Sequence, residues 1–334
     1  MSTSGAADVA VLGGGSWGTA LAAHLARGGG RVRLWVREPE IAAGINERRE
    51  NPRYLAGVAL PDGVRALCDL AEAARGAPAL VVAIPSEFCR EVYRRLLPFA
   101  APGAPVVSAT KGIETGSLQR MTEVARDEMP GHALAVLSGP SFALEVARGQ
   151  PTAVVVASAD AAVAEALQRR FSARTFRAYT SDDVVGVELA GALKNVIAIA
   201  AGIVAGLGYG HNTLAALITR GLAEIARLSV SCGARADTLA GLAGLGDLVL
   251  TCTGALSRNR HVGQALGRGR TLDEALRETG MVAEGVRTTP AACALAERQG
   301  VEMPIAVQMK AVLQEGKPPR EALEELMLRS LKRE

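Results

Sequence analysis

The stretch Val9-Ala-Val-Leu-Gly13-Gly-Gly15-Ser-Trp-Gly18-Thr-Ala-Leu-Ala decides the fold of this 334-residue chain. A short apolar strand runs into G-x-G-x-x-G, and the third glycine already lies on an Ala/Leu-rich helix. In a dinucleotide-binding unit, Gly13 permits the tight turn, Gly15 lets the backbone approach a pyrophosphate, and Gly18 allows close packing of helix on strand. The pattern therefore predicts a βαβ unit that binds a dinucleotide, rather than a purely structural glycine turn.

The next strand carries the residues that choose between the two nicotinamide dinucleotides. Val32-Arg-Leu-Trp-Val36 ends where an enzyme that uses NAD has an acidic residue for the ribose 2′-hydroxyl. Arg37 stands there instead, and a guanidinium suits the 2′-phosphate of NADPH. NADPH is favoured, with NADH also open because Glu38 is adjacent.

Composition excludes several classes of protein. The net charge of +3 is too small, and its basic residues too scattered, to predict binding to nucleic acid or a membrane surface. The five cysteines are spread singly and no signal peptide is visible, which predicts reduced thiols in the cytoplasm and no metal site. The longest apolar run, 196–207, is too short to span a bilayer and predicts a buried helix.

The order of apolar runs divides the chain into two domains. Uninterrupted apolar strands alternate with helical segments such as 87–97, 117–128 and 161–171, which predicts a parallel sheet covered on both faces. The alternation stops at residue 183. We expect a Rossmann-like α/β dinucleotide-binding domain over 1–183 and an all-helical substrate domain over 184–334. Further strands are expected at 79–84, 105–109, 133–137 and 152–157.

Two lysines are the strongest candidates for chemistry. Only five of the 37 basic residues are lysines, and Lys111 and Lys194 are the only two among the first 309 residues. In a chain that uses arginine elsewhere, lysine indicates a need for an ammonium that can lose its proton. Lys194 lies in an apolar helix, where burial would lower its pKa into the range useful for acid–base catalysis. Lys111 follows a strand at the carboxyl edge of the sheet, where ligands bind.

Three further clusters accompany the lysines. Asp247 is a single carboxylate in an apolar stretch, either a helix cap or a partner that orients a lysine. Ser257-Arg-Asn-Arg260 places a cap residue and basic donors at a helix start, either a phosphate site or a solvated turn. Ser138-Gly-Pro-Ser-Phe-Ala143 leaves the carboxyl end of a strand.

Taken together, these pieces resemble the NAD(P)-dependent glycerol-3-phosphate dehydrogenases of the bacterial cytoplasmic type. The resemblance covers nearly the whole chain in the family order. Gly14 stands where the family has alanine, which should only loosen the turn. The matching segments are 13–18, 51–55, 109–114, 138–143, 193–196, 244–247, 257–259 and 282–285.

The resemblance implies a role for each matching residue. Lys194 corresponds to the family's proton acceptor, with Lys111, Asn195 and Asp247 completing the catalytic set. It implies cofactor contacts for Gly13, Gly15, Ser16, Trp17, Gly18, Arg37, Lys111, Ala143, Arg258, Val282 and Glu284. It implies substrate contacts for Lys111, Gly139, Ser141, Lys194, Asp247, Ser257, Arg258 and Asn259.

The implied reaction interconverts dihydroxyacetone phosphate and sn-glycerol 3-phosphate with NADPH or NADH, and supplies glycerol 3-phosphate for glycerophospholipid synthesis. No metal is required, and the Ala- and Gly-rich helices would allow a homodimer. Because the residues come from both domains, the site is expected between them. Two alternatives remain open. One is a relative of the same architecture that acts on a small hydroxyacid, and the other is an NADPH-sensing module without activity.

Overall fold

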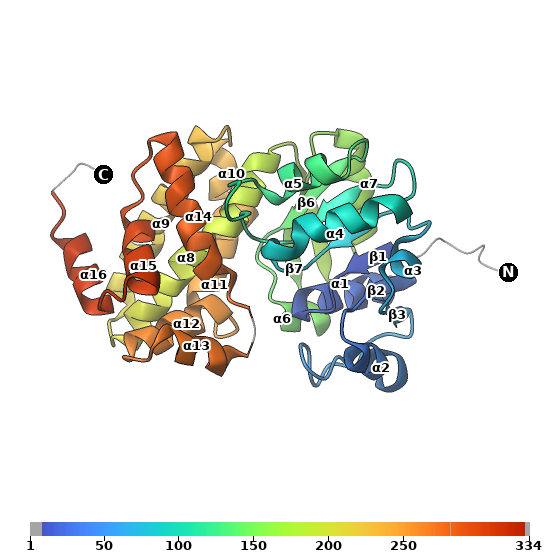
Figure 1. The fold of residues 1–334 in the computed structure, drawn as a ribbon, viewed down its shortest axis with the longest axis horizontal. Helices are drawn as coiled ribbons and strands as arrows, with labels where there is room; N and C mark the ends of the chain where they lie inside the picture. The colour runs from blue at the N-terminus through green and yellow to red at the C-terminus, as the bar shows by residue number, and fades with distance from the viewer. Residues whose placement is uncertain (1–8, 281, 331–334) are drawn as a thin grey trace. The chain divides into compact units, whose positions relative to one another are not determined.

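A computed structural model describes residues 9–280 and 282–330 (Figure 1). The chain forms two compact units. The first comprises the chain up to Thr110 together with Met121–Val184, and the second comprises Lys111–Arg120 together with the chain from Val185 onward. The sequence places a boundary at residue 183, next to this division, but it assigns 111–120 to the first domain, whereas these residues pack with the second unit.

The first unit is built on a mixed eight-stranded sheet in the order β3-β2-β1-β4-β5-β6-β7-β8. The order of the first six strands, which all run parallel, is that of a Rossmann fold. The strands are β1 (Val9–Leu12), β2 (Val32–Trp35), β3 (Val64–Leu67), β4 (Leu80–Val82), β5 (Val106–Ser108), β6 (Leu134–Ser138), β7 (Thr152–Ala157) and β8 (Phe176–Ser181).

The last two strands correct the expectation of a wholly parallel sheet. β7 pairs with β6 in the antiparallel sense, and β8 then pairs parallel to β7. The connection between these two strands, 139–151, contains one five-residue helix, α6 (Ala143–Ala147). After it the chain returns beside the strand that it has just left, in the opposite direction.

Helices cover the sheet of the first unit, and apolar residues of the strands and helices form its core (Figure 1). Gly18 of the glycine-rich motif lets α1 (Ser16–Arg27) approach β1 closely, because a Cβ on Gly18 would lie 1.9 Å from the carbonyl oxygen of Gly13. Besides α1 and α6, the α-helices of this unit are α2 (Pro39–Arg48), α3 (Leu70–Ala74), α4 (Cys89–Leu96), α5 (Met121–Glu128) and α7 (Ala161–Phe171).

From Val184 onward the described residues of the second unit form helices joined by loops, and α8 (Val184–Gly206) runs through its core. The segment 111–120 adds no helix to this unit and contains an isolated bridge between Ile113 and Arg120. This helix is long and apolar enough to cross a membrane by length and composition, but 89% of its most apolar window is buried in the protein. A core helix explains both properties. The remaining helices are α9 (His211–Ser231), α10 (Ala236–Ala240), α11 (Asp247–Thr253), α12 (Arg258–Gly267), α13 (Leu272–Thr279), α14 (Glu284–Gln299), α15 (Pro304–Gln314) and α16 (Pro319–Met327).

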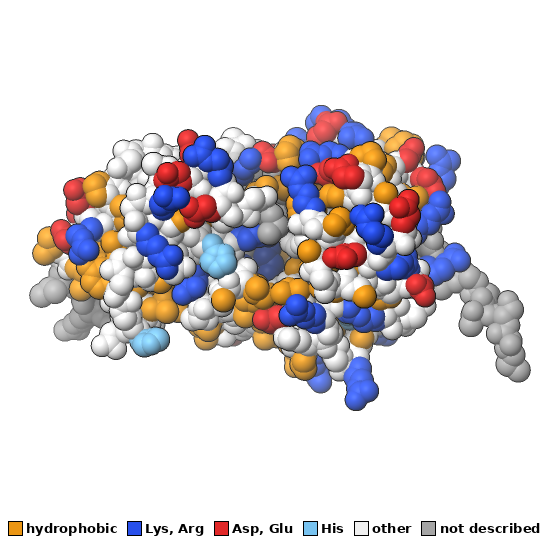
Figure 2. Space-filling model, turned by 90° about the horizontal axis from the view of Figure 1, so that it is seen from below, with side chains coloured by type: hydrophobic (Ala, Val, Ile, Leu, Met, Phe, Trp, Pro, Cys, Tyr) orange, Lys and Arg blue, Asp and Glu red, His pale blue; other side chains and the backbone are white. Residues whose placement is uncertain are grey.

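Charged side chains of both signs alternate over the surface seen in Figure 2, with basic and acidic groups interspersed rather than gathered by sign. This distribution agrees with the small net charge of +3. On this face, basic side chains do not form a broad patch of the kind that attracts a polyanion.

Candidate active site

The loop between β1 and α1 has the features of a pyrophosphate-binding loop. Gly15 is the N-cap of α1, and no side chain caps the helix there. A Cβ on Gly15 would meet nothing within 4 Å, so the outer side of the loop is open. Helix N-termini with free amides attract phosphate. These residues therefore fit a dinucleotide, with Ser16 and Trp17 in the first turn of the helix.

Gly14 does not loosen this turn, contrary to the expectation from the sequence. A Cβ at this position would lie 2.6 Å from Cγ1 of Val36, the residue after β2. The loop is therefore packed tightly against the next strand, and alanine would require Val36 to move.

Arg37 lies on the surface beside Glu38. Its guanidinium forms a 3.0 Å ion pair with Glu38, and 73% of its side chain is exposed. Glu38 also accepts a 3.4 Å hydrogen bond from the hydroxyl of Tyr54. Glu38 therefore has two partners of its own, and Arg37 keeps donors that could reach a 2′-phosphate.

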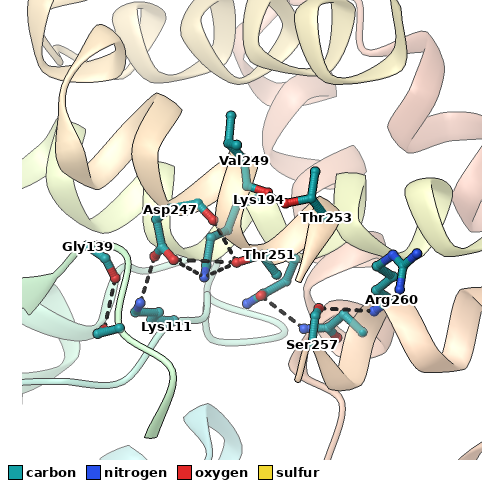
Figure 3. Close-up of polar contacts among 12 residues, drawn as sticks. Lys111, Gly139, Lys194, Asp247, Val249, Thr251, Thr253, Ser257 and Arg260 are labelled. Carbon is teal, nitrogen blue, oxygen red and sulfur yellow. Dashed lines mark hydrogen bonds and ion pairs between the residues drawn. The ribbon is translucent and has the colours of Figure 1, made fainter. Parts of the chain in front are cut away.

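In the second unit, Lys111 and Lys194 converge on Asp247 (Figure 3). The Nζ of Lys194 lies 2.5 Å from Oδ1, and the Nζ of Lys111 lies 2.6 Å from Oδ2. All three side chains are mostly buried, with Asp247 only 1% exposed. Asp247 is the first residue of α11 and follows a π-helical turn, Leu242–Gly246. It is thus the partner of both lysines, and its interpretation as a helix cap is wrong.

Thr251 joins this cluster, and the sequence analysis missed it. Its hydroxyl donates to the backbone oxygen of Asp247 at 2.7 Å and accepts from Lys194 at 2.7 Å. The available signal was the spacing, because residues four apart on a helix share one face. An ammonium has three protons, and Lys194 gives two of them to Asp247 and Thr251. The third has no acceptor among the described residues.

Burial lowers the pKa of Lys194 from 10.5 to about 8, and the nearby charge of Lys111 acts in the same direction. Asp247 opposes both effects by favouring the charged form. A lysine with this pKa can hold or release a proton near neutral pH.

The segment 112–120, which follows Lys111, packs against the second unit. Ile113 is buried in the core of that unit. Arg120 forms a 2.6 Å ion pair with Glu188 of α8, and both side chains are largely buried. Leu118 packs on the same core with a positive φ of 60°. This anchoring explains why Lys111, which follows a strand of the first unit in sequence, contacts Asp247.

The start of α12 presents unused donors. Ser257 is the N-cap, and its Oγ accepts from the backbone N–H of Arg260 at 3.2 Å. No described residue hydrogen-bonds or ion-pairs with the guanidinium of Arg258. Burial lowers the pKa of Arg258, while the charge of Glu284 opposes the shift. Arg258 is half-buried, and a cation at a helix N-terminus attracts a dianion.

A chain of hydrogen bonds sets the orientation of Asn195. The backbone N–H of Gly285 donates to Oδ1 of Asn259 at 2.9 Å, and Nδ2 of Asn259 donates to Oδ1 of Asn195 at 3.0 Å. Because the first donor is a backbone N–H, both amides have one consistent orientation. Within residues 9–280 and 282–330 the Nδ2 of Asn195 has no acceptor, so it can donate to a ligand one residue from Lys194.

The other residues that the resemblance implicates lie at loops and helix starts. In the first unit, Ser141 donates to the backbone oxygen of Gly139 at 2.9 Å, and Ala143 begins α6. In the second unit, Glu284 begins α14, and Val282 precedes it. Among residues 9–280 and 282–330, no cluster of three or more His, Cys, Asp or Glu side chains could hold a metal ion.

Comparison with known proteins gives the family. The N-terminal description of the NAD-dependent glycerol-3-phosphate dehydrogenases matches residues 8–164, and the C-terminal description matches residues 183–324. A glycerol-3-phosphate dehydrogenase [NAD(P)+] of Nitratidesulfovibrio vulgaris is 55% identical over 98% of this chain and 99% of its own. One of Geobacter is 54% identical over the same shares.

Solved structures agree with these relatives. The glycerol-3-phosphate dehydrogenase of Coxiella burnetii is 43% identical, with a TM-score of 0.94 over 97% of this chain and 99% of its own. The enzyme of Saccharomyces cerevisiae is 29% identical, with a TM-score of 0.81 over 95% of this chain and 98% of its own. The chain belongs to the NAD-dependent glycerol-3-phosphate dehydrogenase family.

Proposed function

We propose that this protein interconverts dihydroxyacetone phosphate and sn-glycerol 3-phosphate with NADPH or NADH. The observation that carries the proposal is the contact of two buried lysines with one carboxylate, Asp247. The names of the relatives state the same substrate and cofactors. Glycerol 3-phosphate made in this way would supply glycerophospholipid synthesis.

Each unit contributes one part of the binding machinery. In the first, the open N-terminus of α1 would hold the pyrophosphate, and Arg37 the 2′-phosphate of NADPH. In the second, Arg258 and the free amides at the start of α12 would hold the substrate phosphate. A phosphate dianion suits this site better than a carboxylate, because it offers more acceptor oxygens to the same donors.

Proton transfer would use Lys194. When bound, the reduced nicotinamide supplies a hydride to C2 of the ketone. Lys194 would donate its unused proton to the C2 oxygen, and the oxygen would end as the hydroxyl of glycerol 3-phosphate. Lys111 and the free Nδ2 of Asn195 would polarise the same oxygen. Asp247 and Thr251 hold Lys194 in place, and Asp247 balances its charge. In the reverse direction Lys194 would accept the hydroxyl proton.

A direct assay tests the proposal. Purified protein is mixed with NADPH, and the loss of NADPH absorbance is followed when dihydroxyacetone phosphate is added. Rapid oxidation supports the proposal. Oxidation with a keto acid but not with dihydroxyacetone phosphate would favour the hydroxyacid alternative. Binding of NADPH without turnover of any of these compounds would favour a sensing module.

We also propose a cytoplasmic location and a homodimer. The scattered single cysteines support the location, because all five are free in the structure. The Ala- and Gly-rich helices of the second unit support the dimer. Light scattering during size-exclusion chromatography measures the mass in solution, and a mass near 34.6 kDa would rule the dimer out.

A further inference from the structure

A buried asparagine outside the glycine-rich loop contacts the inner side of that loop. Asn51 lies between α2 and β3 and has no exposed surface. Its Nδ2 donates to the backbone oxygen of Gly14 at 2.8 Å and to Oγ1 of Thr19 at 2.8 Å. Its Oδ1 accepts from the backbone N–H of Tyr54 at 3.0 Å. Since the donor at Oδ1 is a backbone N–H, the amide has only one consistent orientation.

The bond to Gly14 determines which way the next N–H points. The peptide between Gly14 and Gly15 is trans, as are the other described peptides. In a trans peptide the C=O and N–H point in opposite directions. The Gly14 oxygen points inward to Asn51, so the Gly15 N–H points outward. That N–H has no acceptor among the described residues, and the space beside Gly15 is open.

The loop is held from a second side as well. Val36 packs so closely against Gly14 that a Cβ there would lie 2.6 Å from Cγ1. Thr19, on the first turns of α1, donates a longer 3.3 Å hydrogen bond to the same Gly14 oxygen. The position of the loop is thus set by packing, while the tilt of the Gly14–Gly15 peptide is set mainly by the shorter bond from Asn51.

We propose that Asn51 is a positioning residue for the cofactor, which turns the Gly15 N–H toward the dinucleotide pyrophosphate. Asn51 acts through the peptide and touches no ligand atom itself. The inference rests on the proposed function, because it takes NADPH or NADH as the ligand. The affinity for the pyrophosphate would thus depend on Asn51, a side chain 36 residues beyond Gly15 in sequence.

Asn51→Asp is the most informative variant. Aspartate keeps the oxygen that accepts from Tyr54, and therefore keeps the neighbouring Glu38 and Arg37 in place. It has no proton to give to Gly14, and its charge would repel the Gly14 oxygen. Binding is measured by the fluorescence of NADPH, and by competition for ADP-ribose and adenosine 2′-monophosphate. We expect NADPH and ADP-ribose to bind about 10-fold more weakly, the loss of one charge-assisted hydrogen bond. Adenosine 2′-monophosphate, which lacks the pyrophosphate, should bind as before.

Two further measurements separate positioning from general stability. Lowering the pH protonates the new aspartate and restores one O–H donor, so the loss relative to the unaltered protein should shrink. Asn46→Asp is the matched control, because Asn46 exchanges two hydrogen bonds with the backbone of Ala66 in the same unit and, among the described residues, has no hydrogen bond to the loop. It should lower the melting temperature and leave the Kd of NADPH unchanged.

The outcomes distinguish this inference from the proposed function. If the unaltered protein binds no NADPH, the proposed function and the inference fall together. If it binds NADPH and Asn51→Asp binds equally well, or loses the same factor for all three ligands, the inference alone is overturned. Should Asn51→Asp fail to fold, Asn51→Ala removes the same donors without adding a charge, and the same ligand pattern is required of it.

Discussion

Lys194 is buried and donates two hydrogen bonds, and its third proton has no acceptor in the described part of the chain. Lys194→Arg keeps the charge but cannot transfer a proton at neutral pH. We expect kcat to fall by at least about 100-fold, within the range of general acid–base groups. The Kd of NADPH, measured by fluorescence, should change little. Near-normal turnover of Lys194→Arg would exclude the proton-transfer role.

The lowered pKa of Lys194 gives this residue a second test. Oxidation of glycerol 3-phosphate needs the neutral amine, so kcat/KM in that direction should rise with pH through about 8. Reduction of dihydroxyacetone phosphate needs the ammonium and should fall over the same range. The two profiles are measured with cofactor saturating. Profiles that change in the same direction would contradict the assignment.

Arg258 is the residue that should recognise the substrate phosphate. Arg258→Ala should depress kcat/KM for dihydroxyacetone phosphate by about 10- to 100-fold, because a charge-assisted hydrogen bond contributes about 1.5–3 kcal/mol. The weak activity with unphosphorylated dihydroxyacetone should hardly change, since that compound has no group to lose. Both are compared at saturating NADPH. An equal loss for the two substrates would place the phosphate elsewhere.

For single residues, the sequence predicts which side chains belong to the site better than it predicts which other side chains they contact. Lys194 and Lys111 stand out by composition alone, in a chain that otherwise uses arginine. Thr251 does not stand out, because its role depends on the turn of α11 that faces Lys194. The two alternatives for Asp247 could be separated only by contacts between residues far apart in the chain.

Helices α8 and α12 carry Lys194 and Arg258 respectively, so the distance between the two helices sets the spacing of these two side chains. A Cβ on Gly263 of α12 would lie 1.9 Å from the backbone oxygen of Ile199 of α8. We therefore expect Gly263→Ala to push the helices apart, to destabilise the protein by about 1–3 kcal/mol, and to raise KM for dihydroxyacetone phosphate.

Thermal unfolding and steady-state kinetics check the Gly263→Ala prediction. Gly269→Ala would be a poor control, because its positive φ of 86° is itself unfavourable for alanine. Ala265→Gly on the same helix is better, since it lowers helix propensity without adding an atom. A raised melting temperature for Gly263→Ala would contradict the close packing.

The elements that the sequence predicts best are those with a clear period. Helix α7 has the expected bounds, 161–171, because its apolar spacing is uninterrupted. The edge strands β3 and β8 are absent from the prediction, since polar residues interrupt the apolar run of each strand. The antiparallel pairing of β7 with β6 could not be predicted either, because the apolar run of β7 does not specify the direction in which the strand pairs.

At the scale of the whole molecule, stability should depend on pH through Glu224. This side chain of α9 is 3% exposed and accepts hydrogen bonds from the backbone N–H groups of Ile305 and Ala306, in the first turn of α15. Burial raises the pKa of Glu224 from 4.5 to about 7, against those hydrogen bonds and the charges of Arg227 and Arg329.

The sign of the effect follows from this raised pKa. Between pH values of about 4.5 and 7 the folded state holds more protons than the unfolded state, so the contribution of Glu224 is complete below that range and is lost as the pH rises through about 7. The loss is on the order of 3 kcal/mol. Urea unfolding of the protein and of Glu224→Gln at several pH values measures it. The two stability curves should diverge between about pH 4.5 and pH 7, and parallel curves would refute the prediction.

The anchoring of 111–120 to the second unit limits how this gene can be divided. A chimera that takes residues 1–183 from a relative, to change its cofactor preference, would also exchange Lys111 and Arg120. The relative's residue at position 111 would then have to form the ion pair with Asp247, and its residue at position 120 the ion pair with Glu188. An exchange that leaves 111–120 native keeps both ion pairs intact, so recombination should respect the fold's discontinuous boundary rather than the linear one.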